Sequence, residues 1–231
     1  AFQGQVTALQ HTYQIRRKIV PLTVKDYFPD ITELQINRFS KLEELYHFWN
    51  SRINVISRKD MDNLFVHHIL HSLSVARIIS FKPGTRILDA GTGGGFPGIP
   101  LAIMFPHASF TLLDSIAKKI SVVSSVTDAL GLSNVNPLRK RIEEEKDRYD
   151  FVISRAVTRF PAFVSLTMKN IDKRSYNDLP NGIIYLKGGD FQDELESYKD
   201  RVSVYNIAGF FDHPYFDTKK IIYLPAEIPE K

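Results

Sequence analysis

The sequence of 231 residues contains no cysteine. This absence excludes disulfides, thiolate zinc sites, iron–sulfur clusters and cysteine nucleophiles, and it suits a reducing compartment. Any chemistry must therefore use other side chains, the backbone or a bound cofactor. We expect a cytoplasmic protein.

Long apolar runs are also missing. The longest extends over only a few residues, whereas a membrane-spanning helix needs roughly 20. The start of the chain lacks the charged stretch and long apolar block that mark a secretory signal. We expect no membrane partner. We interpret residues 1–24 as an upstream extension, a processed end or a non-native remnant, ordered or disordered.

The chain has only a small excess of positive charge, since it contains 30 Lys and Arg and 26 Asp and Glu, a formal net charge of +4. Three of the 30, namely Arg16, Arg17 and Lys18, belong to residues 1–24, which contain no acid. The rest of the chain therefore has 27 basic and 26 acidic residues and is nearly neutral. Such a balance permits a nucleic-acid partner without indicating one, so that assignment must rest on motifs.

Two helical patterns precede residue 81. Apolar residues recur every three to four positions over residues 32–53, with Pro29 and Asp30 as start signals. A second helix is predicted over residues 60–79, with Ser57 and Asp60 as a capping box. We therefore expect an N-terminal helical region over residues 25–80.

From residue 81 onward, short β-branched runs alternate with helical patterns, which predicts a parallel, doubly wound sheet. The last two strand patterns, RVSVYNIAGF and TKKIIYLPAE, are joined by a loop too short for a crossover helix. These two strands should pair antiparallel. The predicted fold class is α/β, with the sheet domain over residues 81–231.

The strongest local signal is RILDAGTGGGFPG, residues 86–98, which predicts a strand, a glycine turn and a helix opening at Pro97. Glycines let the backbone approach a ligand closely, and free N–H groups at a helix start can bind a carboxylate or phosphate. Gly93, Gly95 and Gly98 also fit the dinucleotide pattern G-x-G-x-x-G. Asp114 suits the ribose of either cofactor, whereas Asp89 and the closing antiparallel pair favour S-adenosylmethionine.

Seven segments, in order along the chain, resemble the glucose-inhibited division protein B family. They are WNSRINVIS (49–57), HHILHSL (67–73), LDAGTGGGFPGIPLA (88–102), LLDSIAKK (112–119), RIEE (141–144), DFVISRA (150–156) and YLKGG (185–189). The resemblance implies a class I S-adenosylmethionine-dependent methyltransferase, with a Rossmann-like, mostly parallel seven-stranded sheet that ends in an antiparallel hairpin. It also implies methylation of N7 of a guanine, that of position 527, in 16S ribosomal RNA or the small ribosomal subunit.

The resemblance also implies a cofactor site. Gly91 and Phe96 would line it, Asp114 would hold the ribose, Ile142 and Glu143 would flank the adenine, and Arg155 would close it. The full predicted cofactor set is Asp89, Gly91, Gly93, Gly95, Phe96, Asp114, Ile142, Glu143 and Arg155. Simpler alternatives are a helix cap for Asp114, a core contact for Ile142, a solvated acidic face for Glu143 and a structural ion pair for Arg155.

Arg155 and Lys187 are the predicted catalytic residues, because both stand at strand ends and could project into one cleft. Guanine N7 loses no proton on methylation, so we expect these cations to bind phosphate or guanine O6 instead of acting as a base. The predicted RNA contacts are His68, Arg139, Lys140 and Arg159, and each could instead be a solvated surface group. Further basic candidates are Arg52, Arg58, Lys59, Lys173 and Arg174.

His67 and His71 lie one helical turn apart, but no H-E-x-x-H pattern supports a metal site, and we expect none. The family has Arg, His and Asp at positions 67, 68 and 71, so only His68 matches. We expect a monomer. The alternative functions are a methyltransferase of the same fold with another substrate, an NAD-dependent oxidoreductase, and a cofactor-sensing binding module.

Overall fold

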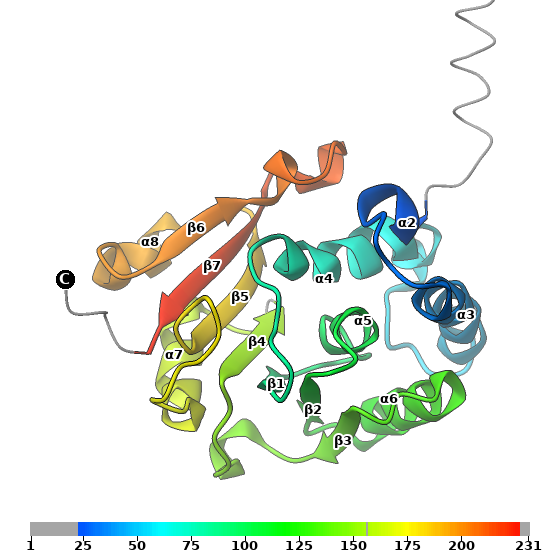
Figure 1. Cartoon of the computed structure of the whole chain (residues 1–231), viewed down its shortest axis with the longest axis horizontal. Coiled ribbons are helices and arrows are strands. Elements are labelled where there is room, and N and C mark those ends of the chain that lie inside the picture. The colour runs from blue at the N-terminus through cyan, green and yellow to red at the C-terminus, as the bar shows by residue number, and fades with distance from the viewer. Residues whose placement is uncertain (1–22, 156, 227–231) are drawn as a thin grey trace, which may run out of the picture.

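A seven-stranded sheet forms the centre of the computed structural model, which describes residues 23–155 and 157–226 (Figure 1). The strand order is β3-β2-β1-β4-β5-β7-β6. The strands are β1 (Arg86–Ala90), β2 (Ser109–Asp114), β3 (Val135–Arg139), β4 (Phe151–Arg155), β5 (Gly182–Gly188), β6 (Ser203–Asn206) and β7 (Lys219–Pro225). The α-helices are α2 (Val24–Tyr27), α3 (Glu33–Asn50), α4 (His71–Leu73), α5 (Gly98–Met104), α6 (Ala117–Leu130), α7 (Phe160–Thr167) and α8 (Gln192–Leu195).

The sheet is parallel over its first five strands and antiparallel at its last two. β1 pairs with β2 and β4, β2 with β3, and β4 with β5, all in parallel. β7 pairs antiparallel with both β5 and β6. The predicted α/β fold with a closing antiparallel pair is confirmed. Parallel strands bring their carboxyl ends to one edge, where ligands of such sheets bind.

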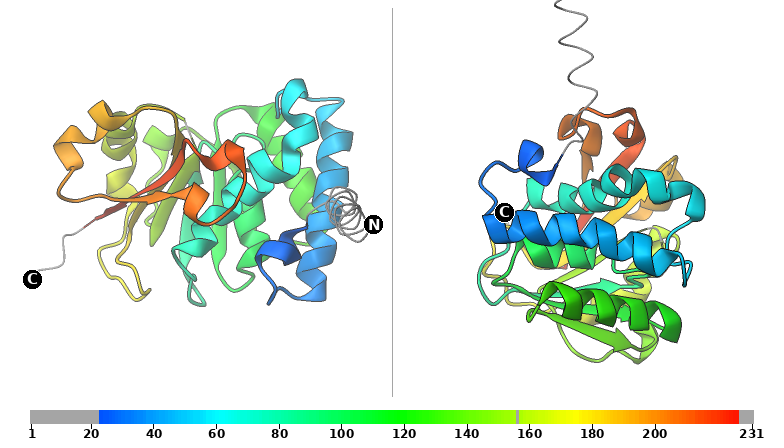
Figure 2. Two further views of the ribbon diagram at one scale, coloured as in Figure 1. Left: turned by 90° about the horizontal axis from the view of Figure 1, so that it is seen from above. Right: turned by 90° about the vertical axis from the view of Figure 1, so that its right-hand side faces the viewer.

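Helices cover both faces of the sheet, because successive side chains of a strand point to opposite faces. In β4, Phe151 and Ile153 enter one hydrophobic core, together with α3, α5 and α6, whereas Val152 enters the second core, together with α7 and α8. Figure 2 shows these layers from two further sides. The buried Leu42 and Tyr46 of α3 belong to the first core, so the N-terminal helical region packs directly on the sheet.

Helix α3 begins at Glu33, one residue after the predicted start at Thr32. Thr32 is the N-cap, and its side chain and backbone form a capping box with Gln35. Pro29 and Asp30 lie just before this cap, as predicted. The side-chain nitrogen Nε2 of Gln35 also donates to the carbonyls of Ile103 and Met104, which fastens the start of α3 to the end of α5.

The second predicted helix is not one regular α-helix. It consists of a 3₁₀ helix (Arg58–Asn63), a π-helix (Leu64–Leu70), the short α4 and another 3₁₀ helix (Ser74–Arg77). The capping box predicted for Ser57 and Asp60 is wrong, because the Ser57 side chain makes no capping bond. The Asp60 carboxylate instead forms hydrogen bonds with the side chains of His67 and His68. π-Helical turns inside helices are frequent at functional sites.

The extension expected over residues 1–24 lies outside the described residues, except for Thr23 and Val24, which open α2. Within the part of the chain that the structure describes, no helix has the length and apolar character needed to cross a membrane.

Gly182 in β5 faces the backbone of β7 with no room for a side chain. A Cβ there would lie 2.3 Å from the carbonyl oxygen of Leu224 and 2.9 Å from Cα of Pro225. We expect Gly182→Ala to lower the free energy of unfolding by about 1–3 kcal/mol, the usual cost of overpacking. Gly209→Ala is the matched control, since a Cβ there meets no atom within 4 Å. Urea unfolding of both variants checks this, and equal stabilities would contradict it.

Candidate functional site

A cavity of about 570 Å³ opens at the carboxyl ends of β1, β2 and β4. Its volume lies in the range that small-molecule and cofactor sites occupy. The lining combines backbone of the glycine turn with apolar and charged side chains from several elements. It includes Val55, Gly91, Gly93, Phe96, Asp114, Ile116, Lys119, Lys140, Arg141, Ile142, Glu143, Arg155, Val157 and Thr158.

The glycine turn is held by the buried carboxylate of Asp89 at the end of β1. Its Oδ2 accepts from the Thr92 hydroxyl at 2.6 Å and from the Gly98 N–H at 2.8 Å. The expectation that free N–H groups at the start of α5 bind a ligand is therefore wrong, because Gly98 donates to Asp89 and Ile99 donates to the Gly95 carbonyl. Asp89 does not line the cavity, and it acts on the cavity only by fixing the conformation of the glycine turn.

Two glycines of the turn form the cavity wall with positive φ, 73° at Gly91 and 60° at Gly93. A Cβ at Gly91 would lie 2.7 Å from a methyl of Val157, while one at Gly93 would meet no atom within 4 Å. The turn thus exposes bare backbone to the cavity, as a cofactor in close contact requires. Gly95 does not line the cavity, and a Cβ there would lie 2.5 Å from Cδ1 of Ile99 and 2.8 Å from the hydroxyl of Tyr46.

Asp114 at the end of β2 has both a structural role and a place in the cavity. Its Oδ1 accepts from the Ile116 N–H at 2.9 Å, and its Oδ2 accepts from the Gly93 N–H at 3.0 Å. The helix cap weighed from the sequence is not formed by Asp114, because Ile116 is the N-cap of α6 and, at this helix start, Asp114 accepts only from the N–H of that residue. A carboxylate has about four acceptor sites, so two bonds leave capacity for the hydroxyls of a ligand.

Ile142 and Glu143 line the cavity from a short 3₁₀ helix, Ile142–Glu144, that follows β3. The three consecutive glutamates at 143–145 differ in burial. Glu143 and Glu144 are exposed, whereas Glu145 is 1% exposed and accepts from the backbone N–H groups of Lys146 and Asp147. The interpretation as a solvated face therefore fits the exposure of Glu143 and Glu144, although Glu143 also lines the cavity, whereas Glu145 is buried and anchors the segment that carries Ile142 and Glu143.

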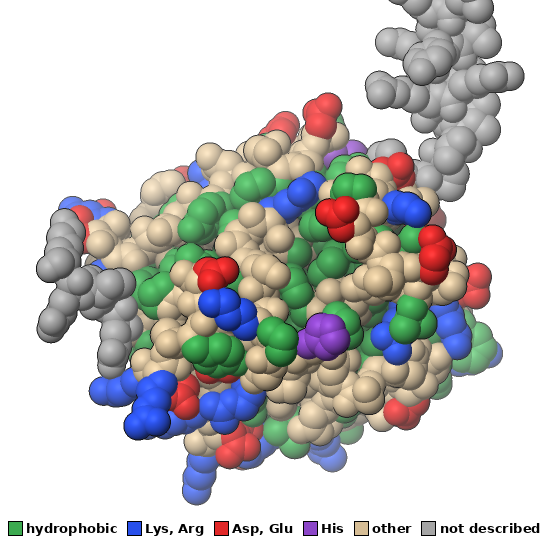
Figure 3. All heavy atoms as spheres, viewed as in Figure 1, with side chains coloured by type: hydrophobic (Ala, Val, Ile, Leu, Met, Phe, Trp, Pro, Cys, Tyr) green, Lys and Arg blue, Asp and Glu red, His purple; other side chains and the backbone are tan. Residues whose placement is uncertain are grey.

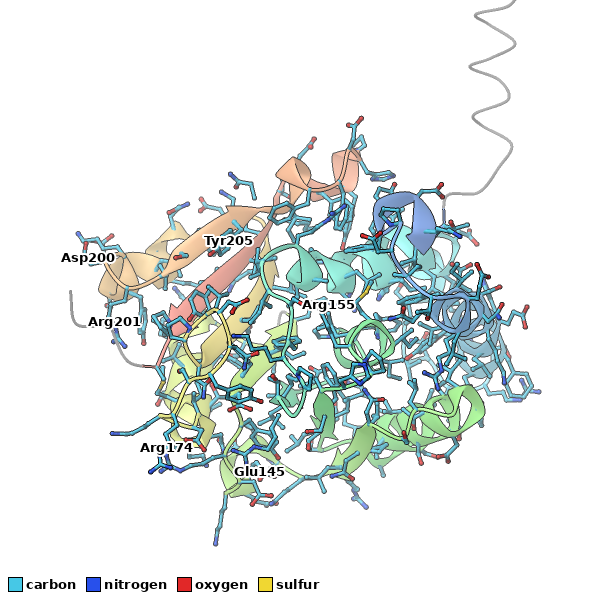
Figure 4. All side chains as sticks on the ribbon, viewed as in Figure 1. Glu145, Arg155, Arg174, Asp200, Arg201 and Tyr205 are labelled. Carbon is cyan, nitrogen blue, oxygen red and sulfur yellow. The ribbon has the colours of Figure 1, made fainter. Side chains whose placement is uncertain are left out.

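Arg155 ends β4 and reaches the cavity between α4 and the sheet (Figure 4). Its guanidinium donates to the His67 carbonyl at 3.0 Å and to Nδ1 of His68 at 2.9 Å, and it lies 5.4 Å from the ring centre of Phe96. His68 is buried and its two ring nitrogens face Asp60 and Arg155, which disfavours the RNA contact predicted for it and excludes the alternative of a solvated surface group. Burial lowers the pKa of His68 to about 4, with the charge of Arg155 acting in the same direction and Asp60 opposing both.

Lys187 does not share the cleft with Arg155. Arg155 is paired with Leu186 in the sheet, so Leu186 lies on its face and the next residue, Lys187, points to the other face. There Lys187 forms an ion pair with Glu194 of α8, which also accepts from the Phe160 N–H. The sequence revealed that both cations stand at strand ends but not which face each one takes.

The predicted basic contacts divide into those at the cavity and those elsewhere. Lys140 lines the cavity and pairs with Glu145 at 3.2 Å, and the exposed Arg139 precedes it. Arg159 is exposed and paired with Asp193. Arg174 lies on the segment before β5, near the amino ends of the strands (Figure 4). Basic and acidic side chains are mixed in that area of Figure 3.

Sequence reasoning missed several cavity residues. Val55 lies in the quoted SRINVIS segment, and its backbone N–H is held by the side chain of Asn50 at 2.9 Å. Val157 is 50% exposed at the wall, two residues after Arg155. The motif around Val55 was the available signal for it, whereas Val157 carried none. Among the described residues, no three His, Asp or Glu side chains are grouped to hold a metal ion.

The family model GidB, described as rRNA small subunit methyltransferase G, matches residues 35–211. The Ribosomal RNA small subunit methyltransferase G of Flavobacterium johnsoniae is 54% identical over 201 residues, which cover 87% of this chain and 96% of that protein. The protein of that name from Christiangramia forsetii is 52% identical over 204 residues, covering 88% and 96%.

The chain is also similar to a crystal structure of a SAM dependent methyltransferase from Aquifex aeolicus. The TM-score is 0.53 at 15% sequence identity, covering 73% of this chain and 98% of that chain. At this identity the likeness concerns the fold alone, and it confirms the class I methyltransferase fold expected from the sequence.

The buried Asp89 predicts a pH-dependent stability. Burial raises its pKa from 3.8 to about 7, although the bonds from Thr92 and Gly98 oppose the rise. The folded state therefore holds this proton more tightly, and the associated stability is present below about pH 4 and is lost as pH rises through about 7. We expect the difference in unfolding free energy between the wild type and Asp89→Asn to become less favourable to the wild type as pH rises from about 4 to about 7. Denaturant titrations of both proteins at several pH values measure this difference. A pH-independent difference would contradict the raised pKa.

Proposed function

This chain belongs to the rRNA small subunit methyltransferase G family, and from this premise we propose that it methylates N7 of guanine 527 in 16S ribosomal RNA. Its cofactor is S-adenosylmethionine. The dinucleotide interpretation of the glycine turn is set aside with this assignment. The single observation that carries the proposal is the cavity that unites the glycine turn, Asp114 and Arg155 at one edge of the sheet. We further propose that a cytoplasmic monomer is the acting form.

The residues that line the cavity are chemically complementary to the groups of S-adenosylmethionine. Gly91 and Gly93 offer bare backbone for close approach, and Asp114 retains acceptor capacity for the two ribose hydroxyls. Ile142 offers an apolar surface to the adenine ring, with Glu143 beside it to accept from an amino group. When bound, the cofactor supplies a methyl group already activated on a sulfonium sulfur.

A guanine N7 acceptor matches the kinds of side chain that surround the cavity. N7 carries a free lone pair and loses no proton, so the protein needs no general base for this transfer. The main requirement is alignment of the acceptor with the methyl group at near-attack distance. Val157 and Ile116 expose apolar surface at the cavity, 50% and 48% of each residue, on which a base could pack.

Arg155 is proposed to bind the acceptor through guanine O6 or a neighbouring phosphate. Two of the five N–H donors of its guanidinium are used by His67 and His68, which leaves three for a ligand. The methylated base is cationic, so an arginine placed against N7 itself would oppose the product. Contact with O6 or phosphate avoids that repulsion.

The RNA backbone is proposed to bind along the ends of β2 and β3. Lys119 and Lys140 line the cavity there, but they already pair with Asp114 and Glu145. The exposed Arg139 and Arg141 form no ion pair with any described residue and are the main candidates. Such side chains can bind phosphates and position the RNA, while the cavity receives the base. Arg159 is a weaker candidate, because Asp193 already balances its charge.

The assignment is tested by the product. Small ribosomal subunits and free 16S ribosomal RNA from cells lacking this protein are incubated with the purified chain and methyl-labelled S-adenosylmethionine. We expect label in 7-methylguanosine at position 527, located by nuclease digestion and mass spectrometry. Label in another base or position would refute the N7 or site assignment, and the absence of label from both the subunits and the free RNA would refute a 16S ribosomal RNA substrate.

The roles of the two strand-end cations are tested by paired substitutions. We expect Arg155→Ala to lower kcat/KM by about 10- to 100-fold, because a hydrogen bond to a charged group contributes about 1.5–3 kcal/mol. Lys187→Ala removes the ion pair with Glu194 on the opposite face and should mainly lower the free energy of unfolding. Single-turnover kinetics and thermal unfolding of both variants check this. Equal kinetic losses would contradict the division of roles.

A further inference from the structure

Asp60 joins two consecutive histidines. Its Oδ1 lies 2.5 Å from Nδ1 of His67, and its Oδ2 lies 2.6 Å from Nε2 of His68. Burial alone would raise the pKa of Asp60, but the hydrogen bonds from the two histidines outweigh it and lower that pKa. Asp60 is therefore an ionised acceptor at neutral pH, and both imidazole nitrogens that face it must carry protons.

The other nitrogen of His68 faces Arg155. Nη2 of Arg155 lies 2.9 Å from Nδ1 of His68, and a guanidinium can only donate. Nδ1 of His68 must therefore accept and carry no proton. One arrangement satisfies both neighbours: a neutral imidazole that donates from Nε2 to Asp60 and accepts at Nδ1 from Arg155.

This chain of bonds supports a cation that has no direct carboxylate partner. Within the described residues, no Asp or Glu lies at ion-pair distance from Arg155, whose two protein hydrogen bonds go to the His67 carbonyl and to His68. Both acceptors stand on the π-helix, and Asp60 binds the side chains of the same two residues. The orientation of the guanidinium in the cavity thus depends on a segment that Asp60 anchors.

His67 is braced from its other side. Its ring stacks on Tyr215 with centroids 3.7 Å apart and an angle of 15°, and Nζ of Lys219 lies 4.7 Å from the ring centre of Tyr215. The Tyr215 hydroxyl also lies 3.3 Å from Nδ1 of His71. The carboxylate of Asp60 is therefore held by one immobilised imidazole while it orients the other.

We propose that Asp60 is a positioning residue that acts through His68 to hold the guanidinium of Arg155 toward the cavity. The importance of this position for methyl transfer rests on the proposed function, whereas the bond chain itself does not. His68 then serves as an oriented acceptor inside the site and His67 as the anchor of the carboxylate. This arrangement accounts for two histidines that the other chemistry of the site does not use.

The protonation pattern can be read directly in the full-length protein without cofactor or RNA. In ¹⁵N-imidazole NMR at neutral pH, with each signal assigned by its loss in His67→Gln or His68→Gln, we expect His68 to carry its proton on Nε2 only. We expect His67 to carry a proton on Nδ1. A proton on Nδ1 of His68 would overturn the proposal, whatever reaction the protein catalyses.

Asp60→Asn gives a sharper test, because an amide offers one acceptor and one donor. Arg155 requires His68 to remain an acceptor at Nδ1, so the amide oxygen should face His68 and the amide nitrogen should donate to Nδ1 of His67. We expect His67 to move its proton to Nε2 while His68 is unchanged. A tautomer change at His68 instead would show that Arg155 does not determine its state and would overturn the proposal.

Kinetics then separate positioning from general structural support. We expect Asp60→Ala to lower kcat/KM for methyl transfer by about 10-fold, because a small misplacement of a substrate-positioning group can cost up to about 100-fold in rate. In an Arg155→Ala background the same change should cost less than about twofold, because coupled residues are not additive. Equal losses in both backgrounds would overturn the proposal.

The matched control is Asp62→Ala, which removes an exposed carboxylate from the same 3₁₀ helix and should leave kcat/KM unchanged. If Asp60→Ala fails to fold, the tautomers of Asp60→Asn decide the question. If the wild type methylates no ribosomal RNA, the proposed function fails, while the NMR results still uphold or overturn the bond chain.

Discussion

The site depends first on two carboxylates that hold the glycine turn. Asp89 at the end of β1 accepts from Thr92 and Gly98, and Asp114 at the end of β2 accepts from Gly93. A turn with several glycines has high conformational entropy in the unfolded chain and needs such bonds to adopt one shape. Because the turn satisfies its own donors in this way, it offers a cofactor a shaped backbone wall and few free N–H groups.

Strand alternation then decides which charges enter the cavity. Arg155 and Lys187 lie at the carboxyl ends of neighbouring parallel strands, Arg155 as the last residue of β4 and Lys187 as the second last of β5. The register that pairs Arg155 with Leu186 places Lys187 on the opposite face. There Lys187 and Glu194 form an ion pair that connects β5 with α8. The cavity therefore receives the guanidinium of Arg155, which is oriented by the His67 carbonyl and by His68. Such a fixed cation can align a substrate, which is the main requirement when the transfer moves no proton.

The N-terminal helical region is part of the site as well as part of the core. It contributes Val55 to the cavity wall, and His68 to the bonds of Arg155. The Tyr46 hydroxyl of α3 donates to the Gly94 carbonyl, so the first long helix also touches the glycine turn. The π-helix allows His67 and His68, although adjacent, to reach one carboxylate. A division at residue 80 therefore separates the N-terminal helices from the sheet domain but passes through the functional unit.

The sequence by itself determined the alternation of strands and helices after residue 80, the glycine turn and the closing antiparallel pair, and its resemblance to a known family indicated that Asp114, Ile142 and Glu143 belong to one cofactor site. These features are encoded in local periodicity, in turn residues and in short motifs that stay adjacent along the chain. Only the tertiary structure decided that Asp89 lies behind the wall, that Lys187 faces away and that Asp60 binds two histidines instead of capping a helix. His68 and Arg155 are 87 positions apart, and their contact depends on how a helix packs on a sheet, which local patterns do not specify.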